Sequence, residues 1–159
     1  MQRITPCLWF DGQAEEAAKF YTGTFSNSKI VTVTQYGAAA AQMTGRPPGS
    51  VMTVIFQLDG QEFMALNGGP QFTFSPAISF IANCDTQQEI DALCEQLSAG
   101  GAMGPCGWLT DKYGLSWQVV PRILGELMQS QDAQKSDKVM QTLLQMQKLD
   151  IVALQEAAR

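Results

Sequence analysis

The stretch that decides the fold is CGWLTDKYGLSWQVVP, residues 106–121. An apolar segment comes first, Asp111 and Gly114 provide turn residues in the middle, and an alternating segment ends at Pro121. Alternation of apolar and polar residues predicts strands, and the Asp-x-x-Gly spacing predicts a tight turn between them. We therefore expect a hairpin here, with Asp111 accepting backbone amides of its own turn.

The segment before this hairpin predicts a strand and a helix. Residues 77–84 read as a strand, and Thr86 and Glu89 match the capping box that opens a helix. Gly100-Gly101 would end that helix, and a short strand is expected near Ala102. The second half of the chain is therefore predicted to be a β-α-β-β-β module.

The first half repeats this order. Its helix, capped by Asp11-Gly12 and starting near Gln13, places apolar residues at helical spacing. Asp59-Gly60 predicts a two-residue hairpin turn. The long segment 38–50 is predicted to be a loop whose role stays open. The expected strands cover residues 4–10, 28–37, 51–58 and 61–67.

Residues from Pro121 onward are predicted to form a helical tail. Pro121 suits a first helical turn, a second helix is expected over residues 135–148, and Asp150 would cap a third. The apolar band of this tail must cover either its own sheet or a partner subunit. We expect one α+β domain over residues 1–159, divided at 1–70, 71–121 and 122–159.

Composition limits the function classes. A net charge of −5 and a pI near 4.6 disfavour nucleic-acid binding, which needs clustered Lys and Arg. No apolar run approaches the roughly 20 residues that span a bilayer. The four cysteines lack C-x-x-C spacing, and no secretory signal precedes the first strand. We therefore expect a cytoplasmic protein with buried, unbridged thiols.

Several motifs resemble a known superfamily. They are LWFDGQAEEA (8–17), FY (20–21), NGGP (67–70), the 106–121 hairpin and MQKLDI (146–151). Together with the repeated module order, they are similar to the vicinal oxygen chelate superfamily, which has the glyoxalase and bleomycin-resistance fold. The finer match is to its PhnB-like branch, often labelled 3-demethylubiquinone-9 3-methyltransferase. The resemblance implies two paired βαβββ modules around a cavity, with the protein usually a homodimer.

The resemblance also implies where a metal would bind. Its metal-dependent members place His on the first strand, His on the strand that opens the second half, and a carboxylate on the last strand. In this sequence those positions are Thr5 or Pro6, residues 77–79, and Gln118. Because the chain has no His and these side chains are weak ligands, we expect no such metal and no cofactor.

Methyl transfer, the activity in the branch's label, is not supported by the sequence. Cofactor-dependent methyl transfer on the common α/β fold uses a glycine-rich loop between a strand and a helix. Residues 100–107 follow a helix instead and read as its end. We therefore expect the label to be an inherited name.

Strand alternation selects candidate site residues. On the first strand Cys7 and Trp9 would face away from the helix, toward the cavity. Cys106, Trp108 and Thr110 would share a face, as would Ser116 and Gln118, with Asn67 at the cavity rim. Each of these residues also has a structural alternative, as core packing or as a partner of buried backbone. The predicted pocket residues are Trp9, Asn67, Cys106, Trp108 and Gln118.

These observations leave three hypotheses, and whether the protein is an enzyme stays open. The first is a dimeric protein that binds a small apolar or aromatic molecule without the usual metal site. The second is a metal-dependent lyase, isomerase or dioxygenase with oxygen ligands such as Asn67 and Gln118. The third is a purely structural dimeric module. The substrate cannot be read from these residues.

Overall fold

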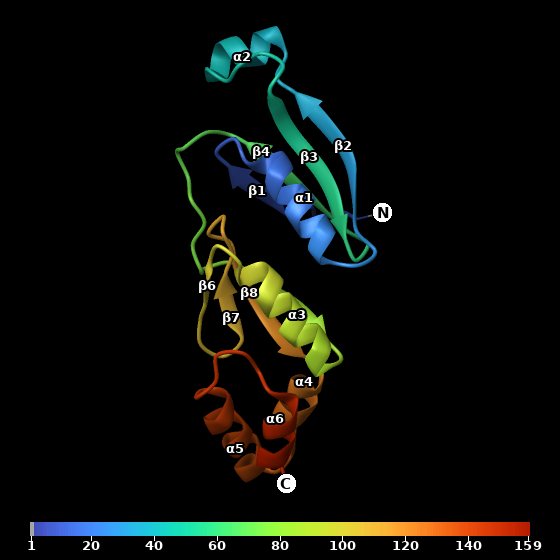
Figure 1. The fold of residues 1–159 in the computed structure, drawn as a ribbon, viewed down its shortest axis with the longest axis vertical. Coiled ribbons are helices and arrows are strands. Elements are labelled where there is room, and N and C mark those ends of the chain that lie inside the picture. The colour runs from blue at the N-terminus through green and yellow to red at the C-terminus, as the bar shows by residue number, and fades with distance from the viewer. Residues whose placement is uncertain (1) are drawn as a thin grey trace. The chain divides into compact units, whose positions relative to one another are not determined.

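The computed structural model describes residues 2–159, which divide into two compact units (Figure 1). The first unit ends at Thr73 and the second spans Phe74–Arg159. Each contains a four-stranded sheet with a helix packed on one face.

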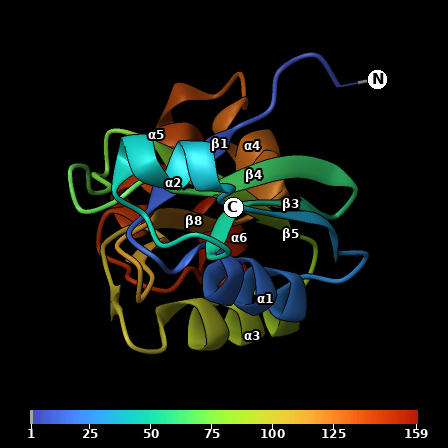
Figure 2. The same ribbon diagram turned by 90° about the horizontal axis from the view of Figure 1, so that it is seen from above.

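The first unit is a βαβββ module with one inserted helix. Its sheet has the order β1-β4-β3-β2, with β1 parallel to β4 and the other pairs antiparallel. Helix α1 lies over one face of this sheet (Figure 2). The elements are β1 (Cys7–Phe10), α1 (Ala14–Thr24), β2 (Lys29–Gln35), α2 (Ala38–Thr44), β3 (Val51–Leu58) and β4 (Gln61–Asn67).

The core of the first unit forms between α1 and the sheet. Three alanines and Tyr21 on one side of α1 are fully buried, as the helical spacing predicts. Tyr21 stacks on Phe56 with ring centroids 6.2 Å apart, and Phe56 stacks on Phe63 at 5.5 Å. Such aromatic pairs contribute about 0.5–1.5 kcal/mol each beyond the area that they bury.

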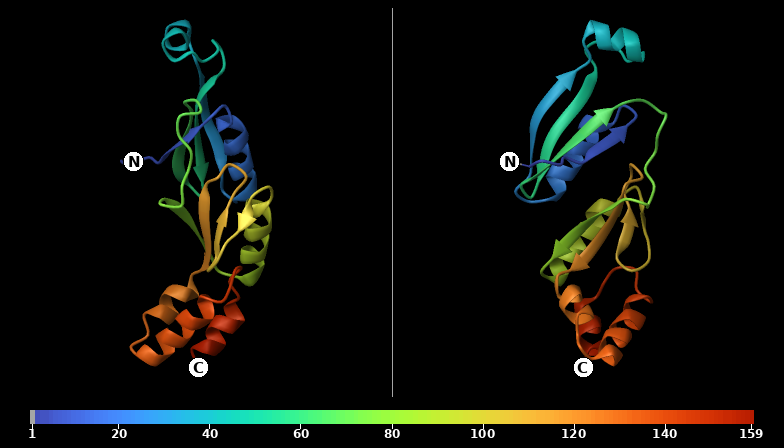
Figure 3. Two further views of the ribbon diagram at one scale, coloured as in Figure 1. Left: turned by 90° about the vertical axis from the view of Figure 1, so that its left-hand side faces the viewer. Right: turned by 180° about the vertical axis from the view of Figure 1, so that it is seen from behind.

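The prediction of a loop over residues 38–50 is wrong in part, because Ala38–Thr44 forms α2. Alanine has the highest helix propensity, and Gly45 ends the helix in the left-handed region, with its N–H bonded to the Ala41 carbonyl. Only Ala41 of this helix is buried, so the segment lacks the apolar periodicity that would have revealed it. Figure 3 shows α2 at the end of the β2–β3 pair.

The second unit repeats the module. Its sheet has the order β5-β8-β7-β6, with β5 parallel to β8, so the duplicated βαβββ arrangement is confirmed. The capping box is also confirmed, since Thr86 Oγ1 accepts the Glu89 N–H at 3.2 Å and Glu89 accepts the Thr86 N–H. The elements are β5 (Ser79–Cys84), α3 (Gln87–Ser98), β6 (Ala102–Met103), β7 (Trp108–Thr110) and β8 (Ser116–Pro121).

The predicted hairpin is present as β7, a turn and β8. The Asp111 side chain is only 2% exposed, and its Oδ1 accepts the N–H groups of Tyr113 and Leu115 at 2.9 and 3.1 Å. Its Oδ2 accepts the indole N–H of Trp117 at 2.9 Å. The turn role of Asp111 is therefore confirmed. Its hydrogen bond to Trp117 connects the turn with the buried side of β8, on which α3 packs.

The tail consists of α4 (Ile123–Met128), α5 (Ala133–Leu143) and α6 (Ile151–Ala157), gathered at one end of the second sheet (Figure 3). Asp150 caps α6 as predicted, by accepting the Ala153 N–H at 3.0 Å. Two predictions are wrong: Pro121 ends β8, and α5 stops at Leu143 instead of continuing to residue 148.

The tail packs on its own unit. Its buried residues form a cluster against which Cys106 and Val120 of the hairpin pack. The buried cluster consists of Val139, Leu143, Leu149 and Leu154.

None of the helices within residues 2–159 is long and apolar enough to cross a membrane.

Candidate functional site

The face of the second sheet opposite α3 brings together two of the predicted site residues. Trp108 on β7 is the direct cross-strand neighbour of Gln118 on β8, and Thr110 is the neighbour of Ser116. Their side chains point away from α3, because the alternate residues Leu109 and Trp117 are buried on the helix side. Directly opposite residues on one sheet face have Cβ atoms about 4.5–5.5 Å apart.

Gln118 is held by a residue on the parallel strand β5. Its Nε2 donates to Ser79 Oγ at 2.9 Å, across 39 positions of sequence. Within residues 2–159 its Oε1 accepts no hydrogen bond, so that oxygen is open to water or a ligand. Ser79 and Gln118 are also the residues at two of the positions where metal ligands would be expected. Here they bond to each other.

A cavity of about 380 Å³ opens on this face, within the volume range of small-molecule sites. Trp108 supplies an aromatic wall, and two hydroxyl side chains supply polar groups. Among residues 2–159, the side chains that line it carry no charge. The lining residues are Pro76, Gly104, Pro105, Trp108, Leu109, Thr110 and Ser116.

Cys106 does not share a strand face with Trp108, contrary to the prediction. It lies in a turn with φ +59, and that turn is closed by a bond from the Trp108 N–H to the Pro105 carbonyl at 3.0 Å. Its N–H donates to the Met146 carbonyl at 2.8 Å, and its side chain packs against the tail cluster. The alternation argument fails because β7 begins only at Trp108.

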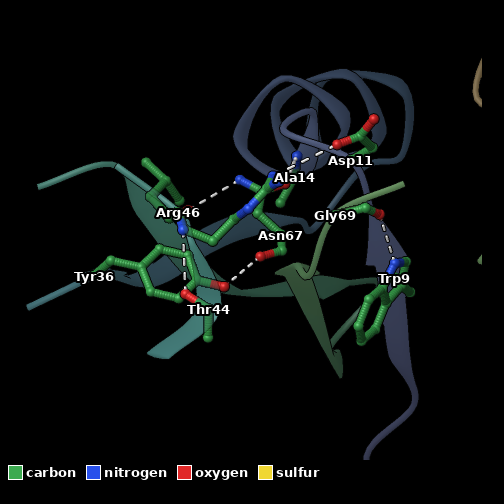
Figure 4. A network of polar contacts seen from close by, with 9 residues as sticks. Trp9, Asp11, Ala14, Tyr36, Thr44, Arg46, Asn67 and Gly69 are labelled. Atoms are coloured by element: carbon green, nitrogen blue, oxygen red, sulfur yellow. Dashed lines mark hydrogen bonds and ion pairs between the residues drawn. The ribbon is translucent and has the colours of Figure 1, made fainter. Parts of the chain in front are cut away.

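Trp9 lies in the first unit, on the face of β1 opposite α1. Its indole N–H donates to the Gly69 carbonyl at 2.9 Å (Figure 4). Its ring packs edge-on against the ring of Phe72, with the two ring centroids 4.9 Å apart. A side chain on Gly68 would place Cβ 2.2 Å from the ring, so only glycine permits this approach. Neighbouring glycines therefore fix the orientation of Trp9.

Asn67, also in the first unit, lies on the α1 side of the sheet beside Phe10 and is 6% exposed. Its Oδ1 accepts the Ala14 N–H at 2.9 Å, and its Nδ2 donates to the Val51 carbonyl at 3.1 Å. Its backbone carbonyl accepts the Tyr36 hydroxyl (Figure 4). Both polar atoms of the side chain are thus used by backbone groups.

Asn67 therefore performs the capping that was expected of Asp11. Asp11 instead forms an ion pair with Arg46 at 3.6 Å (Figure 4), and Gln13 offers no side-chain cap to α1. The motif NGGP was visible in the sequence, but nothing local connects Asn67 with a helix that begins 53 residues earlier. Ligand contacts by Trp9, Asn67 and Cys106 stay predictions.

The donor set does not fit a glyoxalase-type metal. The chain has no His, and residues 2–159 contain no cluster of three His, Cys, Asp or Glu side chains. Gln118 and Ser79 are bonded to each other, and Asn67 Oδ1 is bonded to backbone. Amide and hydroxyl oxygens are poor substitutes for imidazole and carboxylate toward transition metals. We derive no reaction step through a metal.

Two buried cysteines are poor nucleophiles. Burial raises the pKa of Cys84 to about 11, with the charges of Glu89 and Asp85 among the further causes. Burial also raises the pKa of Cys94. Both thiols therefore stay protonated at neutral pH, where a reactive cysteine needs its thiolate form.

The duplicated βαβββ modules give the chain the fold of the glyoxalase/bleomycin-resistance/dioxygenase class. The fosfomycin resistance protein FosX from Listeria monocytogenes has the same fold, with a TM-score of 0.55 at 12% identity. That match covers 81% of this chain and 98% of FosX.

Within this class, residues 2–120 match the model of a family described as 3-demethylubiquinone-9 3-methyltransferase. The chain belongs to this PhnB-like family. A PhnB protein from Bacillus cereus is 39% identical, with a TM-score of 0.66, and the match covers 76% of this chain and 99% of that one. Protein PA1353 from Pseudomonas aeruginosa is 20% identical, with a TM-score of 0.61 and coverage of 76% and 98%.

The search of curated proteins found no match to this sequence. The family match ends at residue 120, so the tail and its MQKLDI motif lie beyond it.

Proposed function

We propose that the second unit binds a small, uncharged molecule with aromatic or apolar surface in the cavity beside Trp108. One observation carries the proposal: a cavity of about 380 Å³ is lined by Trp108, Thr110 and Ser116 among others, and by no charged residue in the part of the chain that the structure describes. Gln118 lies next to Trp108 on the same face but is not one of the lining residues, so the ligand's polar contacts are assigned to Thr110 and Ser116. Apolar walls with a few placed polar groups are typical of small-molecule sites.

The proposal does not include methyl transfer. Glycines between residues 100 and 107 follow α3 and lead into β6 and β7. They do not join a strand to the start of a helix, as the glycine-rich loop of a nucleotide-type cofactor site does.

The homodimer implied by the resemblance is part of the proposal, and sedimentation equilibrium would measure it.

Titration with uncharged aromatic probes, such as benzamide and phenol, tests the proposal. We expect binding to quench tryptophan emission and to raise the melting temperature. Trp108→Leu should weaken binding about tenfold, because the ring contact contributes roughly 1.4 kcal/mol. Met43→Leu, which changes an exposed side chain on α2 of the first unit, is the control and should leave affinity unchanged. Equal affinities for both variants, or no binding at all, would contradict the proposal.

A further inference from the structure

We propose that the C-terminal tail, residues 122–159, positions one wall of the cavity. This inference rests on the proposed function. The link is the loop of residues 104–108, which we call the wall loop. One side of the wall loop lines the cavity, and the other side is bound by the tail.

The wall loop is a compact turn. The Gly104 N–H donates to the Trp108 carbonyl at 2.8 Å, and the Trp108 N–H donates to the Pro105 carbonyl at 3.0 Å. These three residues all line the cavity. Any shift of this turn therefore moves the indole of Trp108 and changes the shape of the cavity.

The other two residues of the wall loop are bound by the tail. Cys106 N–H donates to the Met146 carbonyl at 2.8 Å, and Gly107 N–H donates to the Gln147 carbonyl at 2.7 Å. Two successive amides thus bind two successive carbonyls of the tail. Without the tail, both amides would lose their protein acceptors.

The shape of the wall loop also depends on the tail. Gly107 has φ +83, and a side chain there would place Cβ 3.0 Å from Leu149 Cγ and 2.9 Å from the Val119 carbonyl oxygen. Cys106 has φ +59, which residues with a side chain rarely adopt. Such a backbone conformation persists where surrounding contacts hold it. Here β8 contributes one contact, since the Val119 N–H donates to the Gly107 carbonyl at 2.8 Å, and the tail contributes the bonds from the Cys106 and Gly107 N–H groups to its carbonyls.

A second anchor holds the same part of the tail on α3. Gln87 Nε2 donates to the Leu149 carbonyl, and Gln87 Oε1 accepts the Ile151 N–H, both at 2.9 Å. Lys148 pairs with Asp91 of α3 at 3.0 Å, an exposed contact that adds little. Residues 146–151 are therefore fixed between α3 and the wall loop, and the bonds of Gln87 to the tail link α3 to the cavity wall.

The variant Gln87→Ala in the full chain tests the inference, with Gln88→Ala as the matched control. Gln88 is exposed on the same helix. In Gln87→Ala we expect the amides of Cys106 and Gly107 to exchange about tenfold faster, since their acceptors become mobile. The indole N–H resonance of Trp108 should shift while that of Trp9 does not, and benzamide should bind about three- to tenfold more weakly. Gln88→Ala should change none of these quantities.

Leu149→Ala gives a second, independent perturbation of the contact with Gly107 and should produce the same set of changes. Unchanged exchange at Cys106 and Gly107 in both variants would overturn the inference, because the tail would not hold the wall loop. Faster exchange with an unshifted Trp108 resonance would also overturn it. If the unaltered protein binds no aromatic probe, the proposed function fails, while exchange and the Trp108 resonance still decide the positioning role.

Discussion

Replacing Asn67 by alanine should destabilise the first unit, because this side chain joins the end of β4 to the start of α1. The variant removes the acceptor of the Ala14 N–H and the donor to the Val51 carbonyl. Loss of a helix cap costs about 1 kcal/mol. A carbonyl left unsatisfied at a partly buried site costs about 1–2 kcal/mol more. We therefore expect the free energy of unfolding to fall by about 2–3 kcal/mol.

Urea denaturation followed by circular dichroism measures this loss, and amide exchange at Ala14 locates it. Asn67→Asp keeps an acceptor for Ala14 but sets a carboxylate oxygen against the Val51 carbonyl, so it should retain the exchange protection of Ala14 without retaining the full stability. Asn83→Ala removes an exposed asparagine of β5 and should change stability by less than about 0.5 kcal/mol. A loss in Asn67→Ala no larger than in Asn83→Ala, or unchanged exchange at Ala14, would refute the capping role.

Three further predictions concern single contacts. Asp111→Asn should cost about 2 kcal/mol in urea denaturation, because an amide nitrogen would then face the indole N–H of Trp117. Gly68→Ala should lower the melting temperature and shift the emission of Trp9, whose ring occupies the space that Cβ needs. Because the folded pKa of Cys84 lies near 11, above its ordinary value of 9.0, its contribution to stability is complete below pH 9 and is lost as pH rises to about 11. This loss, measured by urea denaturation across that pH range, should be smaller in Cys84→Ala, where the raised pKa of Cys94 still contributes.

Local signals predicted most of the fold. The capping box at Thr86 and the Asp59-Gly60 turn depend on residues a few positions apart, so they are visible in the sequence. Strand alternation also placed Trp108 and Gln118 on one face of the hairpin, because a tight turn fixes the register of its two strands. Helix α2 was missed because its alanines are mostly exposed and carry no periodic apolar pattern.

Residue patterns alone therefore predict the two βαβββ modules, the turn role of Asp111 and the lack of histidine at the expected metal positions. Only the tertiary structure decided that Asn67 caps a helix 53 residues away and that Gln118 bonds to Ser79. It also decided that Cys106 binds the tail through its backbone. The physical reason is that periodicity and turn chemistry are local, whereas the partner of a polar group depends on which distant segment packs beside it.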